Sequence, residues 1–175
     1  MIVIYIGRRG SGKTLTMVKD AWAYHCGGRR ILSNMEGLTF GKYITNDEIL
    51  KIDKNSDIDN VVFLIDEMQI FFDSRRSMNK SALNFSNFVQ QIRKRGCIIL
   101  GTTQFSNSID KRIRDHTDIV AKPKYKEDYR VCEVDYIDIT ALDTGDYYDE
   151  QPSIISLVYD ATNVFKLYNT GEMIK

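Results

Sequence analysis

A stretch near the N-terminus has the residue types and spacing of a phosphate-binding loop. The pattern G-x-x-x-x-G-K-[ST] is matched in full by Gly7-Arg8-Arg9-Gly10-Ser11-Gly12-Lys13-Thr14. Its glycines let the backbone turn tightly, so that successive N–H groups can face phosphate oxygens. Lys13 is expected to reach the β- and γ-phosphates of a nucleoside triphosphate, and the Thr14 hydroxyl is expected to bind magnesium. The alternative, a glycine-rich turn without a ligand, is disfavoured by the complete match.

Two carboxylates follow the apolar run Val61–Ile65, which is typical of a buried parallel strand. Ligands of α/β sheets bind at the carboxyl ends of the strands, where Asp66 and Glu67 would lie. Asp66 is expected to hold magnesium through its water shell, and Glu67 is expected to act as general base on an attacking water. A solvent-exposed acidic turn is the alternative interpretation.

The next apolar run, Ile98–Thr103, ends at Gln104. An amide at this strand end can lie between the γ-phosphate, the attacking water and Glu67. We therefore predict that Gln104 senses the γ-phosphate, although glutamine is also common at strand ends on protein surfaces.

These groups require a strand and a helix around the loop. Ile2–Ile6 is β-prone, and a helix is predicted from Thr14 to about His25. Leu15, Val18 and Trp22 are spaced for one buried face of that helix. Gly27-Gly28 would end it, and Ile31-Leu32 would begin a second strand. A capping-box pattern at Thr45 and Glu48 predicts a short helix thereafter.

An amphipathic helix is predicted from about Ser81 to Lys94, followed by a strand at Cys97–Gly101. Its apolar positions recur at i, i+3, i+4 and i+7, namely Phe85, Phe88, Val89 and Ile92. Strands and helices thus alternate through the first part of the chain, which predicts a right-handed βαβ arrangement with a largely parallel central sheet flanked by helices.

The pattern changes after Asp118. Arg130–Ile139 is β-prone, Thr140–Pro152 is acidic and turn-rich, and two closing strands are predicted at Ile154–Val158 and Val164–Tyr168. The 175 residues fit a single α/β domain, with a core at about 1–125 and a β-rich C-terminal extension at about 126–175.

Charge and cysteine usage exclude several classes of protein. Lys plus Arg and Asp plus Glu both number 24, so no global field favours nucleic acid or membrane. A local row at Lys122, Lys124 and Lys126 could still contact DNA phosphates, although a solvated lysine face is the simpler interpretation. The 3 cysteines form no CxxC pair, which argues against zinc and a disulfide framework. Without a signal peptide or an apolar run of roughly 18 residues, a cytoplasmic protein is expected.

The order of these motifs resembles the FtsK–HerA superfamily of DNA-pumping ATPases. The phosphate loop is followed by Ile-Asp-Glu-Met-Gln, by a helix ending Arg-Lys-Arg-Gly, by a strand ending Thr-Thr-Gln and by Ile109–Arg114. Within that superfamily the chain is most similar to small viral genome-packaging ATPases and to zonula occludens toxin-like assembly proteins of filamentous phages. Ser33-Asn34 and Val164–Thr170 also resemble that group.

The resemblance implies a magnesium-dependent ATPase that assembles as a homo-oligomer, a hexameric ring with ATP at subunit boundaries. It implies double-stranded viral DNA in the channel, contacts with capsid or other viral proteins, and an arginine that reaches the ATP of the neighbouring subunit. Four candidates for that role are Arg93, Arg95, Arg112 and Arg114, of which we favour the last two. Toxin-like assembly proteins usually carry a membrane segment, and its absence from this sequence favours genome packaging over phage extrusion.

Two other interpretations remain. Ile65–Phe72 resembles the corresponding strand of thymidine kinase, in which Glu67 would deprotonate a nucleoside hydroxyl. The paired zinc cysteines of that family are missing here. A nucleotide-binding switch without catalysis is the third possibility, and the complete hydrolytic set of residues argues against it.

Overall fold

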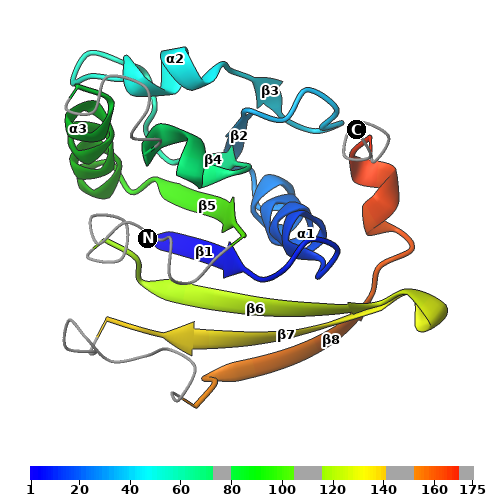
Figure 1. The fold of residues 1–175 in the computed structure, drawn as a ribbon. Coiled ribbons are helices and arrows are strands. Elements are labelled where there is room, and N and C mark those ends of the chain that lie inside the picture. The colour runs from blue at the N-terminus through cyan, green and yellow to red at the C-terminus, as the bar shows by residue number, and fades with distance from the viewer. Residues whose placement is uncertain (73–79, 105–115, 141–151, 170–175) are drawn as a thin grey trace.

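The computed structural model describes residues 1–72, 80–104, 116–140 and 152–169, and its main feature is one eight-stranded sheet (Figure 1). The strands are β1 (Ile2–Ile6), β2 (Arg30–Ser33), β3 (Lys42–Tyr43), β4 (Val61–Ile65), β5 (Ile98–Thr103), β6 (Ile119–Lys126), β7 (Val131–Asp138) and β8 (Ile155–Asp160). Their order across the sheet is β3-β2-β4-β5-β1-β6-β7-β8. The pairs from β3 to β6 are parallel, and β7 and β8 are added antiparallel. The predicted α/β fold with a largely parallel sheet is confirmed.

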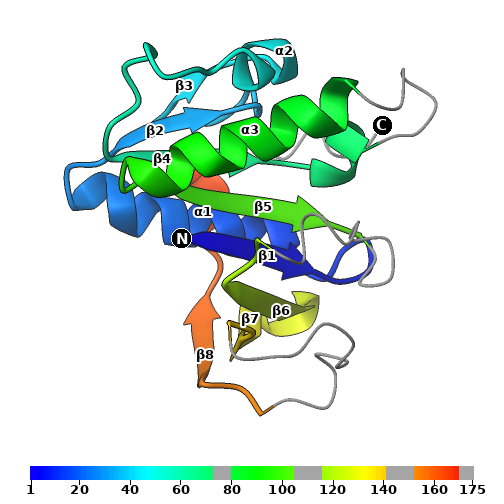
Figure 2. The ribbon, with the colours of Figure 1, turned by 90° about the vertical axis from the view of Figure 1, so that its left-hand side faces the viewer.

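Helices cover both faces of the parallel part (Figures 1 and 2). On one side lies α1 (Lys13–Cys26), and on the other lie α2 (Asn46–Leu50) and α3 (Lys80–Lys94). The alternation along β1 divides the core accordingly, because Ile2, Ile4 and Ile6 pack on the α3 side. Val3 and Tyr5 pack with α1 instead. The described residues also form the short 3-10 helices η1 (Met68–Phe72), η2 (Glu127–Tyr129) and η3 (Val164–Leu167).

The predicted capping box is present at the start of α2. Glu48 N–H donates to the Thr45 hydroxyl over 3.2 Å, and Thr45 N–H donates to the Glu48 carboxylate over 2.7 Å. Each residue thereby satisfies a backbone donor that the helix itself leaves unpaired. The hydrogen bonds that the Glu48 carboxylate accepts from the Thr45 N–H and hydroxyl hold the pKa of Glu48 below its ordinary value.

The strand β6 was not predicted from the sequence, because it contains several lysines and a proline. Its register with β1 ends at the pair Tyr5 and Ala121, and the rest of the strand extends past the end of β1. Pro123 therefore lies where β6 has no partner on the β1 side, and the missing N–H of proline is tolerated at such an edge. The lysines lie on alternate positions of the same strand, which gives one polar face.

Two predictions about local structure were wrong. Val164–Tyr168 is not a strand, since Val164 N–H and Phe165 N–H both bond to the Ala161 carbonyl and start the 3-10 turn η3. Of this segment, only Tyr168 joins a β-bridge, opposite Leu38. Trp22 is 38% exposed, because the buried stripe of α1 continues through Ala21, and the indole packs edge-on against Phe40 with 5.0 Å between ring centroids.

Candidate functional site

The phosphate-loop sequence forms the turn between β1 and α1. Gly10 and Gly12 adopt left-handed backbone conformations, with φ of 80° and 91°. A Cβ atom at Gly7 would lie 2.5 Å from Ser11 Oγ, so a side chain at position 7 would clash with the loop itself. Among the described residues Ser11 Oγ is buried without a hydrogen-bond partner, and no side chain caps the N-terminus of α1. An orphaned hydroxyl beside an uncapped helix start fits phosphate oxygens.

Lys13 lies over this loop. Its side chain is half-buried, and Nζ donates to the Arg8 carbonyl over 3.0 Å. Burial lowers the pKa of Lys13, while the nearby carboxylates of Asp66 and Glu67 act in the opposite direction. The amine therefore lies between the loop backbone and the two acids. A lysine in this position can bind phosphates that extend from the loop toward the acids.

Asp66 meets the start of α1 at the carboxyl end of β4. Its Oδ1 accepts from the Thr14 hydroxyl over 3.3 Å and from the Thr102 hydroxyl over 2.5 Å. A hydroxyl and a carboxylate are hard oxygen donors, and magnesium takes few protein ligands besides phosphates and waters. Thr14 and Asp66, predicted as the magnesium ligands, therefore lie together and fit the ion.

Glu67 takes a different environment from its neighbour in sequence. Its backbone is left-handed with φ of 54°, and its N–H donates to the Thr102 hydroxyl over 3.0 Å. The side chain is exposed, and Gln104 Nε2 donates to Glu67 Oε1 over 3.4 Å. The turn after β4 thus leaves one carboxylate beside the helix hydroxyl and the other accessible to water and to Gln104.

The sheet order explains why these groups meet. Strand β5 lies between β4 and β1, so Thr102 and Gln104 are placed between the acids and the phosphate loop. Close packing continues at Gly101, where a Cβ atom would lie 1.9 Å from Met68 Sδ. Glycine at this position lets η1 return over the sheet directly after Glu67.

Two residues of the site, Asn34 and Thr102, have roles that were not predicted from the sequence. Asp66 N–H donates to Asn34 Oδ1 over 2.8 Å, and Asn34 Nδ2 donates to the Asp66 carbonyl over 3.1 Å. Asn34 follows β2, the neighbour of β4 on the side away from β5. The only sequence signal for these two roles was that each residue is polar and lies at the end of a strand. The strand order had to be known before these strand ends could be placed beside Asp66.

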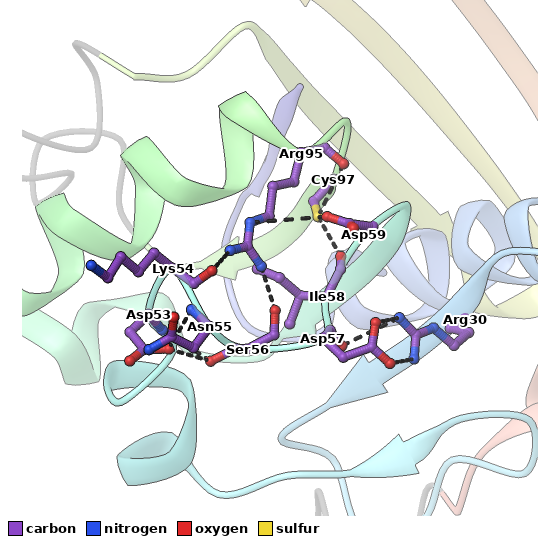
Figure 3. Close-up of polar contacts among 10 residues, drawn as sticks. All are labelled: Arg30, Asp53, Lys54, Asn55, Ser56, Asp57, Ile58, Asp59, Arg95 and Cys97. Atoms are coloured by element: carbon purple, nitrogen blue, oxygen red, sulfur yellow. Dashed lines mark hydrogen bonds and ion pairs between the residues drawn. The ribbon is translucent and has the colours of Figure 1, made fainter.

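Of the four arginines considered for action between subunits, two are bound within the chain. Arg93 donates to the His116 carbonyl over 2.9 Å and to Asp118 Oδ1 over 3.0 Å. Arg95 donates to the carbonyls of Lys54 and Ser56 and lies near Asp59 (Figure 3). Both arginines tie the end of α3 to neighbouring loops. Arg112 and Arg114 lie outside the described residues, and Arg8 and Arg9 are exposed on the phosphate loop.

The loop from 53 to 59, which Arg95 contacts, is also fixed from its other side (Figure 3). Arg30 forms a two-bond ion pair with Asp57 over 2.9 and 3.0 Å, and this contact holds the pKa of Asp57 below its ordinary value. Cys97 Sγ donates to the Ile58 carbonyl over 2.8 Å. The loop from 53 to 59 therefore packs as a structural unit at the amino ends of β4 and β5.

The lysine row of β6 is partly neutralised across the sheet. Lys124 pairs with Asp135 over 3.5 Å, and Lys126 pairs with Glu133 over 2.5 Å. Ser156 also donates to Asp135 over 2.6 Å. These acids reduce the positive potential that DNA phosphates would meet on this face.

No helix in the described part of the chain has the length and apolar character needed to cross a membrane. Within the same residues, no cluster of three or more His, Cys, Asp or Glu side chains is arranged to hold a metal ion by itself.

The central parallel sheet, with a glycine-rich loop between β1 and α1 and an acidic pair after β4, defines the fold of the P-loop nucleoside triphosphatases. The family model described as "Zonular occludens toxin (Zot)" matches residues 43–169, and the chain belongs to that family. The predicted resemblance to zonula occludens toxin-like proteins is thereby confirmed. Comparison with curated protein sequences gives no match.

Solved structures agree on the fold. The N-terminal domain of zonular occludens toxin from Neisseria meningitidis is similar with a TM-score of 0.65 and 19% identity, covering 95% of this chain and 97% of that one. The genome packaging NTPase B204 from Sulfolobus turreted icosahedral virus 2, in complex with ATP-gammaS, has a TM-score of 0.57 and 11% identity, covering 90% and 95%. The RadB recombinase has a TM-score of 0.59 and 10% identity, covering 91% and 86%.

Proposed function

We propose that this chain is a magnesium-dependent ATPase that uses hydrolysis to move DNA, with packaging of a viral genome as its task. The observation that carries the proposal is that the adjacent acids Asp66 and Glu67 have different surroundings. Asp66 bonds to the Thr14 hydroxyl, while Glu67 is exposed and bonds to Gln104. A site that only bound nucleotide would need the first arrangement but not the second.

Each side chain has a defined part in the hydrolysis. Lys13 binds the β- and γ-phosphates, and the loop N–H groups bind the remaining phosphate oxygens. Thr14 and Asp66 hold magnesium, which neutralises charge on the phosphates. Glu67 takes a proton from water as the water oxygen bonds to the γ-phosphorus, and the bond to the β-γ bridging oxygen breaks. Gln104 orients the water and the Glu67 carboxylate.

The coupling to DNA rests on the family and on the resemblance to packaging motors. The genome packaging NTPase B204 shares this fold. We propose a homo-oligomeric, hexameric ring in the cytoplasm with double-stranded DNA in its channel and capsid proteins as partners. Because Arg93 and Arg95 are bound within the subunit, Arg112 and Arg114 are the better candidates for contact with the neighbour's ATP.

Extrusion of filamentous phage is the second candidate function, and the Zot family match favours it. Both functions require the same ATPase site, but they differ in the nucleic acid that is moved. A packaging motor of the proposed kind acts on double-stranded DNA, whereas filamentous phages carry single-stranded genomes.

The test is release of inorganic phosphate from ATP by the assembled protein, alone and with double-stranded or single-stranded DNA. In a parallel reaction with thymidine, formation of thymidine monophosphate is measured. Stimulation by double-stranded DNA supports packaging, and stimulation by single-stranded DNA alone supports extrusion. Phosphorylation of thymidine would replace both with a nucleoside kinase. The oligomeric state is measured in the same samples by light scattering, since a lone subunit lacks the neighbour's arginine.

A further inference from the structure

The segment 161–169 is fixed along the start of α1. Its helix η3 packs against α1, and the two lie side by side in Figure 1. At one end Ala161 N–H donates to the Arg130 carbonyl over 2.8 Å. At the other end Thr39 N–H donates to the Leu167 carbonyl over 2.9 Å, and Asn169 N–H donates to the Gly37 carbonyl over 3.0 Å. Bonds at both ends hold this segment next to the phosphate-loop end of α1.

An aromatic pair joins this segment to the phosphate loop. Tyr125 N–H donates to the Ser11 carbonyl over 3.0 Å, and a Cβ atom at Gly12 would lie 3.1 Å from Tyr125 Cβ. The Tyr125 ring meets the Phe165 ring edge-to-face, with 5.8 Å between centroids and 75° between planes. Both residues are half-buried, so neither is enclosed in the core. The edge-to-face contact restricts how the Tyr125 ring can turn.

The sheet order indicates which part of a nucleotide reaches this pair. Glu67 and Gln104 lie at the ends of β4 and β5, on one side of the phosphate loop, and β6 with Tyr125 lies on the other side of β1. A triphosphate whose γ-phosphate faces Glu67 has its nucleoside at the opposite end. That end is the one on the β6 side, beside Tyr125.

We propose that Tyr125, supported by Phe165, is the surface on which the base of the nucleoside triphosphate stacks. The inference rests on the proposed function, because it adds the base to the same site. Stacking on an aromatic ring suits any nucleobase and excludes ligands without one.

The experiment compares two ligands that share phosphates but differ in the base. Affinity for ATP and for inorganic tripolyphosphate, each with magnesium, is measured by calorimetry for the wild type, Tyr125→Leu, Tyr125→Trp and Phe165→Leu. Tyr125→Leu is expected to weaken ATP binding by about 5- to 150-fold, the range for loss of one base–aromatic stack, and to leave tripolyphosphate binding unchanged. Tyr125→Trp retains ATP binding, and Phe165→Leu gives an intermediate loss. Tyr129→Leu is the matched control, since Tyr129 is 76% exposed on η2.

The outcomes separate this inference from the function it rests on. Equal losses for ATP and tripolyphosphate would assign Tyr125 a purely structural role and overturn the base site. Unchanged ATP affinity in Tyr125→Leu would overturn it as well, while wild-type hydrolysis of ATP leaves the proposed function standing. A wild type that binds neither ligand would overturn both. Tripolyphosphate binding also reports that a variant has folded around an intact loop.

Discussion

The side chain of Asn34 is paired with the backbone of Asp66 through two hydrogen bonds, over 2.8 and 3.1 Å. The amide extends the contact between β2 and β4 by one residue beyond the strands. It thereby fixes the point at which the chain leaves β4 and turns to Glu67. A polar residue outside the phosphate loop thus sets the direction of both acids.

Replacing Asn34 with alanine is expected to destabilise the protein by about 1–3 kcal/mol, because the Asp66 N–H and carbonyl are left without partners. Hydrolysis should fall further than stability alone explains, since Asp66 and Glu67 lose their fixed direction. Urea unfolding and phosphate release check the two effects. Asn46→Ala is the matched control, because Asn46 accepts a hydrogen bond from Asn34 over 3.0 Å and is thus one step removed from Asp66. Equal effects of both variants on turnover would refute the role of Asn34.

Thr102 connects the two acids through one hydroxyl, which accepts from Glu67 N–H and donates to Asp66. Thr102→Val keeps the shape of the side chain and removes both bonds. We expect turnover to fall at least about 10-fold, and the magnesium concentration for half-maximal activity to rise, since a misdirected Asp66 holds the ion less well. Thr102→Ser should restore most of the activity. A magnesium dependence identical to that of the wild type in Thr102→Val would argue against this role.

Lys13 is expected to be required for binding and unfavourable for folding. Burial lowers its pKa in the folded state, so the folded protein disfavours the charged amine. Lys13→Met should therefore raise the melting temperature at neutral pH while reducing turnover by about 100-fold or more. The gain in stability should shrink as pH rises through the folded-state pKa of Lys13 and disappear above the unfolded-state pKa, where the amine is neutral in both states. Calorimetric melting from pH 7 to about 11, beyond the ordinary lysine pKa, checks the sign. A melting temperature below that of the wild type would contradict it.

A mixing experiment tests action of Arg112 and Arg114 between subunits. The double variant Arg112→Ala, Arg114→Ala has an intact Glu67, and Glu67→Gln has intact arginines. Each variant is expected to be inactive alone, whereas a 1:1 mixture should recover activity at about a quarter of the sites. Half of the subunits carry an intact Glu67, and random assembly gives half of these a neighbour with intact arginines. Phosphate release from the mixtures is the measurement. Arg93→Ala is the control, because Arg93 is bound to Asp118 in its own subunit. No recovery on mixing would remove the proposed contact.

The sequence permitted prediction of those parts of the site that are continuous in the chain. Gly7 to Thr14 and the pair Asp66 and Glu67 each carry their chemistry within a few residues, and the structure brings both segments together. Asn34 and Thr102 could not be assigned, because their function depends on the order β2-β4-β5, which no local pattern specifies.

The β-rich extension was predicted less well, for a related reason. The lysines in β6 make the segment look unlike a strand in the sequence. Their charges find acidic partners only when β7 pairs with β6. The start of η3 depends on the Ala161 carbonyl and its place after β8. The β-branched Val164 therefore led to the wrong prediction of a strand at this position. Tyr125 and Phe165 are 40 positions apart in the sequence and meet only through tertiary packing.

The most direct test of the central claim is magnesium-dependent release of phosphate from ATP by the wild type and by Glu67→Gln, with ATP affinity measured on the same preparations. We expect the assembled wild type to turn over ATP, and Glu67→Gln to bind ATP as well as the wild type while hydrolysing it about 100- to 10,000-fold more slowly. Turnover in Glu67→Gln equal to that of the wild type would contradict the assignment of Glu67 as the base. Failure of the assembled wild type to hydrolyse ATP at all would contradict the ATPase itself.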